Sequence, residues 1–105
     1  MPLTDVRDAL LTVGVPVSHY TAVSKPDKYI VWAEEGEGDS QHADNRKSTQ
    51  VLQGTIDYFT KTEYDPNVAK IQESLDDAEI SWKLNSVQYE DATGNIHYEW
   101  IFEVV

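Results

Sequence analysis

Histidine and carboxylate side chains are the residues of this chain that could do chemistry, and three of them lie close together. Asp39, His42 and Asp44 fall within six residues, and carboxylate oxygens and imidazole nitrogens can share a divalent ion. The spacing matches no established loop, because the calcium pattern needs acids at alternate positions and a closing glutamate. We therefore expect a solvated loop or a partner contact here, with no metal and no cofactor.

The remaining acids and histidines suggest surface roles. A catalytic carboxylic acid needs an apolar pocket that raises its pKa. Asp57 is explained by the polar face of a strand, and the neighbours Glu90 and Asp91 by an exposed turn. His19 and His97 are expected on strands, opposite apolar residues, as surface or interface histidines.

Sequence patterns for phosphate binding and nucleophilic catalysis are missing. The chain has no cysteine, no serine in an elbow motif, and neither the G-x-x-x-x-G-K nor the G-x-G-x-x-G pattern. We expect no enzymatic activity and no small-molecule substrate.

Length and composition limit the kinds of protein that this chain could be. With 105 residues the chain is expected to be one domain, residues 1–105. The absence of cysteine fits an intracellular or virion protein better than a small secreted one, and neither a signal peptide nor a membrane span is expected. The net charge of −11 argues against binding to nucleic acid backbones.

Two amphipathic helices are predicted from apolar residues spaced three and four apart. The first is expected to end at Gly14, and the second to begin at Asp65-Pro66, where aspartate caps and proline needs no amide hydrogen. Their apolar stripes are Leu3, Val6, Leu10 and Val13, and Val68, Ile71, Leu75 and Ala78.

Strands are predicted over residues 17–23, 29–33 and 50–60, and a hairpin over residues 80–105. The hairpin alternates apolar and polar residues, with a slip near Asn85-Ser86 that indicates a bulge. Tyr98, Trp100 and Phe102 are expected inward, and Glu99 and Glu103 outward.

The predicted fold class is α+β, with two helices on one face of a mainly antiparallel sheet. The element order is α-β-β-β-α-β-β, with a C-terminal β-hairpin and a long polar loop over residues 34–49. Residues 29–33 are apolar without alternation, which is typical of a strand covered on both faces. A partner subunit is a natural source of the second cover.

Acids crowd the C-terminal end of the second helix, where the helix dipole favours cations. They are Glu73, Asp76, Asp77 and Glu79. A solvated face explains them, and so does a negative patch that serves a function.

Several short strings stand out along the chain, in the order of the predicted elements. They are Gly14-Val15-Pro16-Val17, Tyr29-Ile30-Val31-Trp32, Ala43-Asp44-Asn45, Gly54 to Thr60, the Asp-Pro helix, Val87-Gln88-Tyr89-Glu90 and His97-Tyr98-Glu99-Trp100. Together with the element order, these strings resemble the small neck and tail proteins of long-tailed bacteriophages and prophages, the tail-completion or tail-terminator group.

This resemblance implies a structural protein without an enzymatic step. Members of the group close into rings, commonly hexamers, that complete or terminate the tail tube and join it to the head connector. The implied partners are copies of the chain itself and neighbouring tail or neck proteins. DNA would pass through without specific binding. The implied location is the virion tail or neck, with assembly in the host cytoplasm.

Two sets of residues are expected to serve such a ring. The candidates for the lumen or a partner contact are residues of the long loop: Glu34, Glu35, Glu37, Asp39, His42 and Asp44. The candidates for the subunit interface are Tyr29, Val31, Trp32, Glu73, Asp76 and Asp77.

Two other functions compete with the ring subunit. An acidic inhibitor that mimics DNA would array carboxylates along one face and bind a basic nucleic-acid-binding protein. A small metal- or acid-dependent enzyme would need Asp39, His42 and Asp44 to converge.

Overall fold

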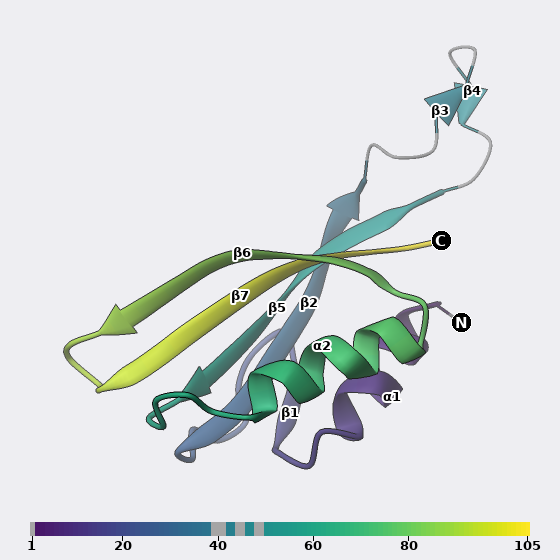
Figure 1. Ribbon diagram of the computed structural model, residues 1–105. Coiled ribbons are helices and arrows are strands. Elements are labelled where there is room, and N and C mark those ends of the chain that lie inside the picture. Colours follow the sequence, from purple (N-terminus) through teal and green to yellow (C-terminus); the bar gives the residue numbers. More distant parts are fainter. Residues whose placement is uncertain (1, 39–41, 44–45, 48–49) are drawn as a thin grey trace.

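The computed structural model describes residues 2–38, 42–43, 46–47 and 50–105. Within them, five strands form one sheet in the order β1-β2-β5-β7-β6, antiparallel except for the parallel pair β1–β2 (Figure 1). The predicted α+β class and element order are confirmed. The elements are α1 (Pro2–Leu11), β1 (Val17–His19), β2 (Lys28–Glu37), β3 (His42–Ala43), β4 (Arg46–Lys47), β5 (Leu52–Thr60), α2 (Asn67–Asp77), β6 (Ser81–Glu90) and β7 (Asn95–Val104).

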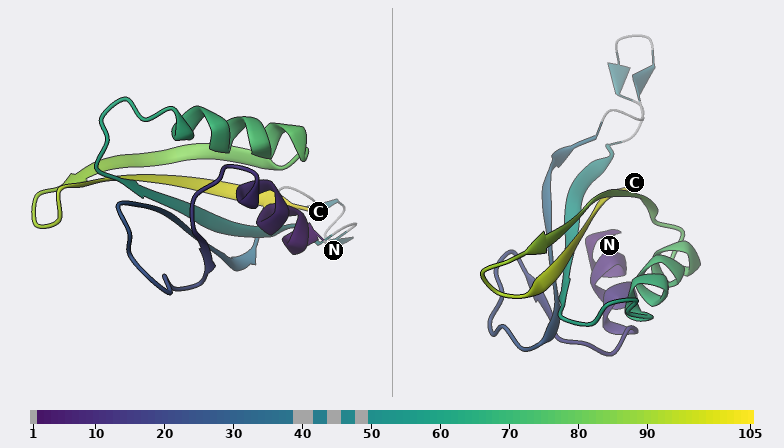
Figure 2. Two further views of the ribbon diagram at one scale, coloured as in Figure 1. Left: turned by 90° about the horizontal axis from the view of Figure 1, so that it is seen from below. Right: turned by 60° about the vertical axis from the view of Figure 1, so that its left-hand side comes forward.

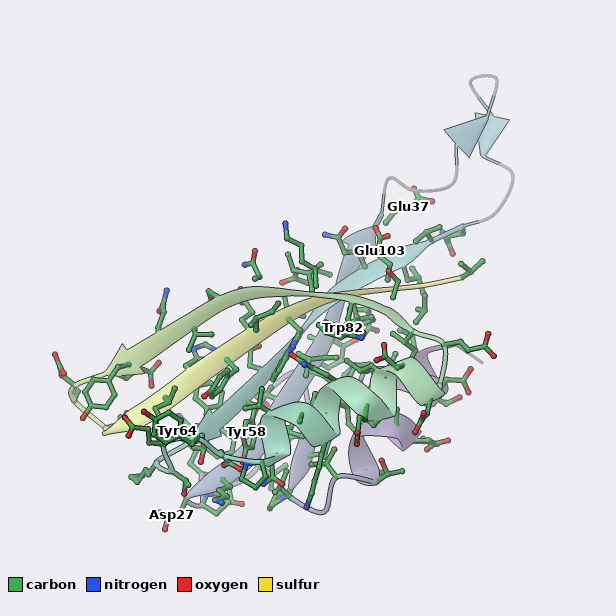
Figure 3. The ribbon with its side chains drawn as sticks, in the orientation of Figure 1. Asp27, Glu37, Tyr58, Tyr64, Trp82 and Glu103 are labelled. Atoms are coloured by element: carbon green, nitrogen blue, oxygen red, sulfur yellow. The ribbon has the colours of Figure 1, made fainter. Side chains whose placement is uncertain are left out.

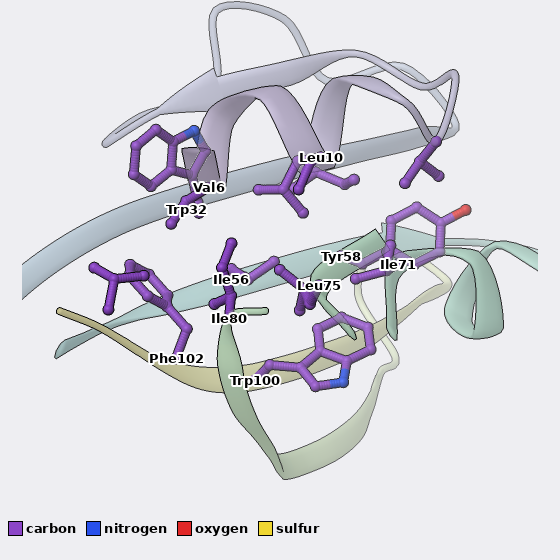
Figure 4. Close-up of a cluster of buried hydrophobic side chains, with 14 residues drawn as sticks. Val6, Leu10, Trp32, Ile56, Tyr58, Ile71, Leu75, Ile80, Trp100 and Phe102 are labelled. Carbon is purple, nitrogen blue, oxygen red and sulfur yellow. The ribbon is translucent and has the colours of Figure 1, made fainter. Parts of the chain in front are cut away.

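Both helices lie on the same face of the sheet, and residues 20–27 pass over the opposite face (Figure 2). The core fills the space between the helices and the sheet. Its side chains come from one stripe of each helix and from alternate positions of β2, β5 and β7, as the two periodicities require. Those labelled in Figure 4 are Val6, Leu10, Trp32, Ile56, Tyr58, Ile71, Leu75, Ile80, Trp100 and Phe102.

The C-terminal hairpin has the predicted register. The pairing of β6 with β7 shifts between Leu84 and Ser86, which places the bulge where the alternation slips. Trp100 and Phe102 are fully buried on the helix side. Tyr98 is half-buried on the same face, while Glu99 and Glu103 are half-buried on the other.

The helix ends follow local chemistry. Oδ1 of Asp65 accepts the amide hydrogen of Asn67 at 2.8 Å, so the predicted aspartate cap is present, although α2 begins one residue after Pro66. Helix α1 ends at Leu11, and Gly14 has a φ of +96°. Glycine accepts this left-handed conformation without a steric penalty. No helix in the described part of the chain is long and apolar enough to cross a membrane.

Two strand boundaries differ from the prediction. The strand expected over residues 17–23 ends at His19, because Tyr20 turns the chain with a φ of 71°. The loop expected over residues 34–49 begins later, because β2 continues through a bulge to Glu37, which pairs with Leu52. The acid and glycine content of residues 34–38 suggested a loop, but long-range pairing with β5 holds them in the sheet. Beyond them, β3 and β4 pair with each other (Figure 1).

Gly54 allows β2 and β5 to approach closely at this bulge. A Cβ atom there would collide with the carbonyl oxygen of Ala33 and lie 2.7 Å from Cα of Glu34 and 2.8 Å from Cε2 of Phe102. Because two of these atoms belong to the backbone, relief requires the strands to separate. Gly54→Ala should lower the free energy of unfolding by about 1–3 kcal/mol, as overpacking does.

The matched control for this prediction is Gly36→Ala on the opposite strand. A Cβ atom at Gly36 meets nothing within 4 Å, so a change of no more than about 0.5 kcal/mol is expected. Urea unfolding followed by circular dichroism measures both variants. Equal stabilities would show that the sheet accommodates the methyl group at no cost.

Candidate functional site

The residues considered for metal binding fall largely outside the described structure. Asp39 and Asp44 lie outside the described residues, and of His42 only the backbone position in β3 is described. Across the residues that the structure does describe, no group of three histidine, aspartate or glutamate side chains could hold a metal ion.

Asp57 and His97, which lie 40 residues apart in sequence, meet on the face of the sheet opposite the helices. Nε2 of His97 is 2.7 Å from Oδ1 of Asp57, and Nδ1 is 3.6 Å from Oε2 of Glu90. The side chains of Asp57 and His97 are about four-fifths buried. One imidazole thus lies between two carboxylates, an arrangement that the sequence did not predict.

Burial raises the pKa of Asp57, and Glu99 and Glu35 raise it further, while His97 opposes the shift. A carboxyl with a raised pKa stabilises the fold most below its ordinary pKa of about 3.9, and this contribution is lost as the pH rises through the folded value. At neutral pH, burying the ionised carboxylate therefore costs the fold stability. Asp57 and Glu99 are direct cross-strand partners, where like charges repel.

Asp57→Asn should consequently leave stability unchanged or raise it by up to about 1 kcal/mol at pH 7, since a neutral polar residue avoids the cost of burying charge. The amide oxygen still accepts a hydrogen bond from His97. Urea unfolding at pH 7 and pH 5 measures the effect, with the exposed Asp91→Asn as the control. A loss above about 1 kcal/mol would mean that the charge itself stabilises the fold through His97.

The acids expected to line a lumen begin on β2. The Glu34 carboxylate accepts a hydrogen bond from the Tyr20 hydroxyl at 2.6 Å and lies 2.6 Å from Nε2 of His19. The Tyr20 hydrogen bond lowers the pKa of Glu34, opposed by desolvation and aided by His19. Glu35 and Glu37 occupy the end of β2, where Figure 3 labels Glu37 beside Glu103.

The residues expected at a subunit interface are divided between the two faces of β2. Trp32 is 3% exposed and belongs to the core beneath the chain's own helices, so it is not available to a partner. Tyr29 is 6% exposed on the opposite face, where it stacks on Phe59. Val31 is half-buried beside it. The second cover of this apolar strand is therefore supplied in part by residues 20–27 of the same chain.

The acids at the end of α2 remain on the surface. Glu73, Asp76 and Asp77 are exposed, and Oδ1 of Asp76 accepts the indole hydrogen of Trp82 at 2.7 Å. Asp76 thus ties α2 to the start of β6.

Strand β6 forms an open edge of the sheet in the described structure. This ten-residue strand pairs only with β7. Leu84, Val87 and Tyr89 are 39%, 51% and 65% exposed. They lie opposite Trp100, Tyr98 and Ile96 and so face the helix side, but the hairpin extends past the helices that would cover them (Figure 1). We call these three residues the β6 strip.

Comparison of the sequence with protein-family models and with curated proteins finds no match.

The β6 strip was not predicted as a contact surface. Its residues alternate in the same way as the inward residues of β7, so the pattern alone indicates burial. The strip residues are exposed because the hairpin extends further than α2, and how far it extends depends on how the elements pack. An open edge with exposed apolar side chains can bind another strand.

Proposed function

We propose that the chain is a structural subunit of the neck or tail of a long-tailed bacteriophage or prophage. In this proposal copies of the chain assemble into a ring that completes or terminates the tail tube and joins it to the head connector. No catalytic step is involved. The open β6 edge with its exposed strip is the observation that carries the proposal.

The β6 edge favours association for two reasons. Its outer backbone groups have no strand partner in the described structure, and such rows of amide and carbonyl groups pair readily with another chain. The strip adds apolar area, whose burial contributes about 25 cal/mol per Å². The strand has no proline, and its two protective features, Lys83 and the bulge between Leu84 and Ser86, both lie in its first half, which leaves residues 87–90 as the more open part of the edge.

A ring also needs a second, different surface on each subunit, since head-to-tail contacts join unlike patches. The opposite edge of the sheet supplies one. Tyr20 and Val23, which follow edge strand β1, are 58% and 93% exposed. Two unlike apolar surfaces at opposite ends of one sheet are compatible with closure into a ring.

The charge fits such a role. A lumen that passes DNA must repel a polyanion, and the net charge of −11 would do so. We propose Glu35 and Glu37 on β2, with the acids of the following segment, as the lumen side. Like charges from neighbouring subunits would repel one another around a ring. Salt should therefore promote assembly, because it screens charges that lie further apart than the Debye length of about 8–10 Å.

Light scattering over a concentration series, followed by negative-stain imaging, tests the proposal. The wild-type chain should form rings, whereas Val87→Lys should remain monomeric with an unchanged circular dichroism spectrum. The control is Gln88→Lys, which adds the same charge to the next residue on the other face of β6. We expect it to assemble.

Two outcomes would contradict the proposal: a wild-type chain that stays monomeric at every concentration and salt level, or rings that form equally well with Val87→Lys. A monomer that binds a basic DNA-binding protein tightly would favour the acidic, DNA-mimicking inhibitor instead.

A further inference from the structure

A hollow of about 700 Å³ lies on the face of the sheet opposite the helices. One side is formed by residues 20–26 and the other by the turn of the C-terminal hairpin, and β2, β5 and β7 form its floor. Figure 2 shows the two flanking segments on the face that the helices leave open. Its volume falls within the range of pockets that bind small ligands.

The floor is a column of three aromatic rings, one from each strand. Tyr29 pairs with Phe59, and Phe59 with His97, so the three are direct cross-strand neighbours. The ring centroids are 4.7 Å apart for Tyr29 and Phe59, and 4.3 Å apart for Phe59 and His97. The stack covers both faces of Phe59 and one face each of Tyr29 and His97, and it gives the hollow a packed, largely apolar floor.

Two carboxylates lie beside the floor of the hollow. Asp57 and Glu90 both line the hollow, on either side of the His97 ring. Glu90 is held in place by the Thr93 hydroxyl, which donates to its Oε1 at 3.3 Å. Desolvation raises the pKa of Tyr29, and the Glu90 charge raises it further.

Two lysines also line the hollow, and the structure accounts for one of them. Nζ of Lys61 lies 3.7 Å from the Asp27 carboxylate and 3.5 Å from Oδ1 of Asn95, so its charge is partly neutralised away from Asp57. Lys25 is exposed on the segment that forms the rim. The cations are thus at the margin, while the carboxylates lie beside the aromatic floor.

We propose that this hollow binds a planar cation, namely the guanidinium group of an arginine side chain presented by a partner protein. Guanidinium is weakly hydrated and donates two parallel hydrogen bonds to a carboxylate, whereas a lysine ammonium acts as a compact, strongly hydrated point charge. Asp57 offers a desolvated carboxylate whose Oδ1 is shared only with His97 among the described contacts. The inference goes beyond the ring and does not depend on it.

Titration of the full chain with N-acetyl-arginine methylamide, followed by two-dimensional NMR, tests this site. Resonances of Tyr29, Phe59 and His97 should shift and saturate, with half-saturation at roughly millimolar concentration for a ligand of this size. The citrulline analogue, which has the same shape without the charge, should bind at least about tenfold more weakly, because the charge-assisted bonds are lost. The lysine analogue should fall between them.

Variants locate the site. Asp57→Asn and Glu90→Gln should each weaken arginine binding by about fivefold or more, since each removes one charge partner. Asp91→Asn is the matched control, because it removes the adjacent exposed acid, and it should leave binding unchanged.

Equal binding of the arginine and citrulline analogues, shifts that do not saturate, or unchanged affinity in both Asp57→Asn and Glu90→Gln would each overturn the inference. Repeating the titration on Val87→Lys separates it from the proposed ring, because that variant alters assembly and leaves the hollow intact.

Discussion

Asp65→Ala should lower the free energy of unfolding by about 3–5 kcal/mol, the loss typical of removing one partner from a buried charged network. The Asp65 side chain is fully buried. Its Oδ2 accepts hydrogen bonds from the Tyr58 and Thr60 hydroxyls, both at 2.7 Å, and lies 3.4 Å from Nζ of Lys28. Its Oδ1 accepts the Asn67 amide hydrogen at the start of α2. The substitution therefore leaves several donors without an acceptor.

The same network gives a defined pH dependence. Desolvation opposes ionisation of Asp65, but hydrogen bonds from Asn67, Thr60 and Tyr58 and the charge of Lys28 outweigh it and lower the pKa. A carboxyl with a lowered pKa contributes stability above its unfolded value of about 3.9, and that stability is lost as the pH falls through the folded value. The loss therefore occurs below about pH 4.

Urea unfolding of the wild type, Asp65→Asn and Asp65→Ala between pH 3 and pH 7 checks both points. The asparagine variant keeps one acceptor oxygen and should lose less, about 1–3 kcal/mol, with a shallower decline in acid than the wild type. Asp27→Ala is the control, since the side chain of Asp27 is 88% exposed. If Asp65→Ala is no more harmful than Asp27→Ala, the network does not stabilise the fold.

Trp100→Ala should cost about 3–5 kcal/mol, as removal of a large core side chain does. Trp100 is fully buried at the centre of the sheet beneath α2, and its indole nitrogen donates to Oε1 of Gln72 at 3.1 Å. The substitution leaves a cavity between β7 and α2, and the side-chain amide oxygen of Gln72 loses its indole donor. Thermal and urea unfolding measure the loss.

The control for Trp100 is another aromatic residue outside the core. Tyr64 is 89% exposed, so Tyr64→Ala should change stability by no more than about 0.5 kcal/mol. Trp100→Phe should lie between the two. If Trp100→Ala lowers the free energy of unfolding only slightly, the helices must move in to fill the space that the indole leaves.

Much of the fold could be predicted because its signals are local. The aspartate cap at Asp65, the left-handed Gly14 and the slip near Ser86 each depend on a few neighbouring residues, and all three are present. Burial of Trp100 and Phe102 follows from alternation along one strand. The local composition around Glu35 and Glu37 indicates a loop. Both residues nevertheless belong to β2, because this strand pairs with β5, a contact that local composition does not indicate.

Neither the hollow nor the β6 strip could be predicted, because both depend on how elements far apart in sequence pack together. His97 and Asp57 lie 40 residues apart in sequence, and they meet only because β5 and β7 pair in one particular register. Val87 and Tyr89 have the alternation of core residues, and their exposure reflects how far the hairpin extends beyond the helices. The order of strands in the sheet decides both features.

The hydrogen bond from the Gly38 amide to the Val51 carbonyl, 2.8 Å long, closes the ladder between β2 and β5. It holds both ends of the chain segment between them, whatever the length of that segment. Each doubling of such a length costs only about 0.6 kcal/mol of closure entropy. Between these two residues the chain should therefore accept an inserted peptide without loss of the folded body, so a bulky insert there would test whether this segment faces the proposed lumen.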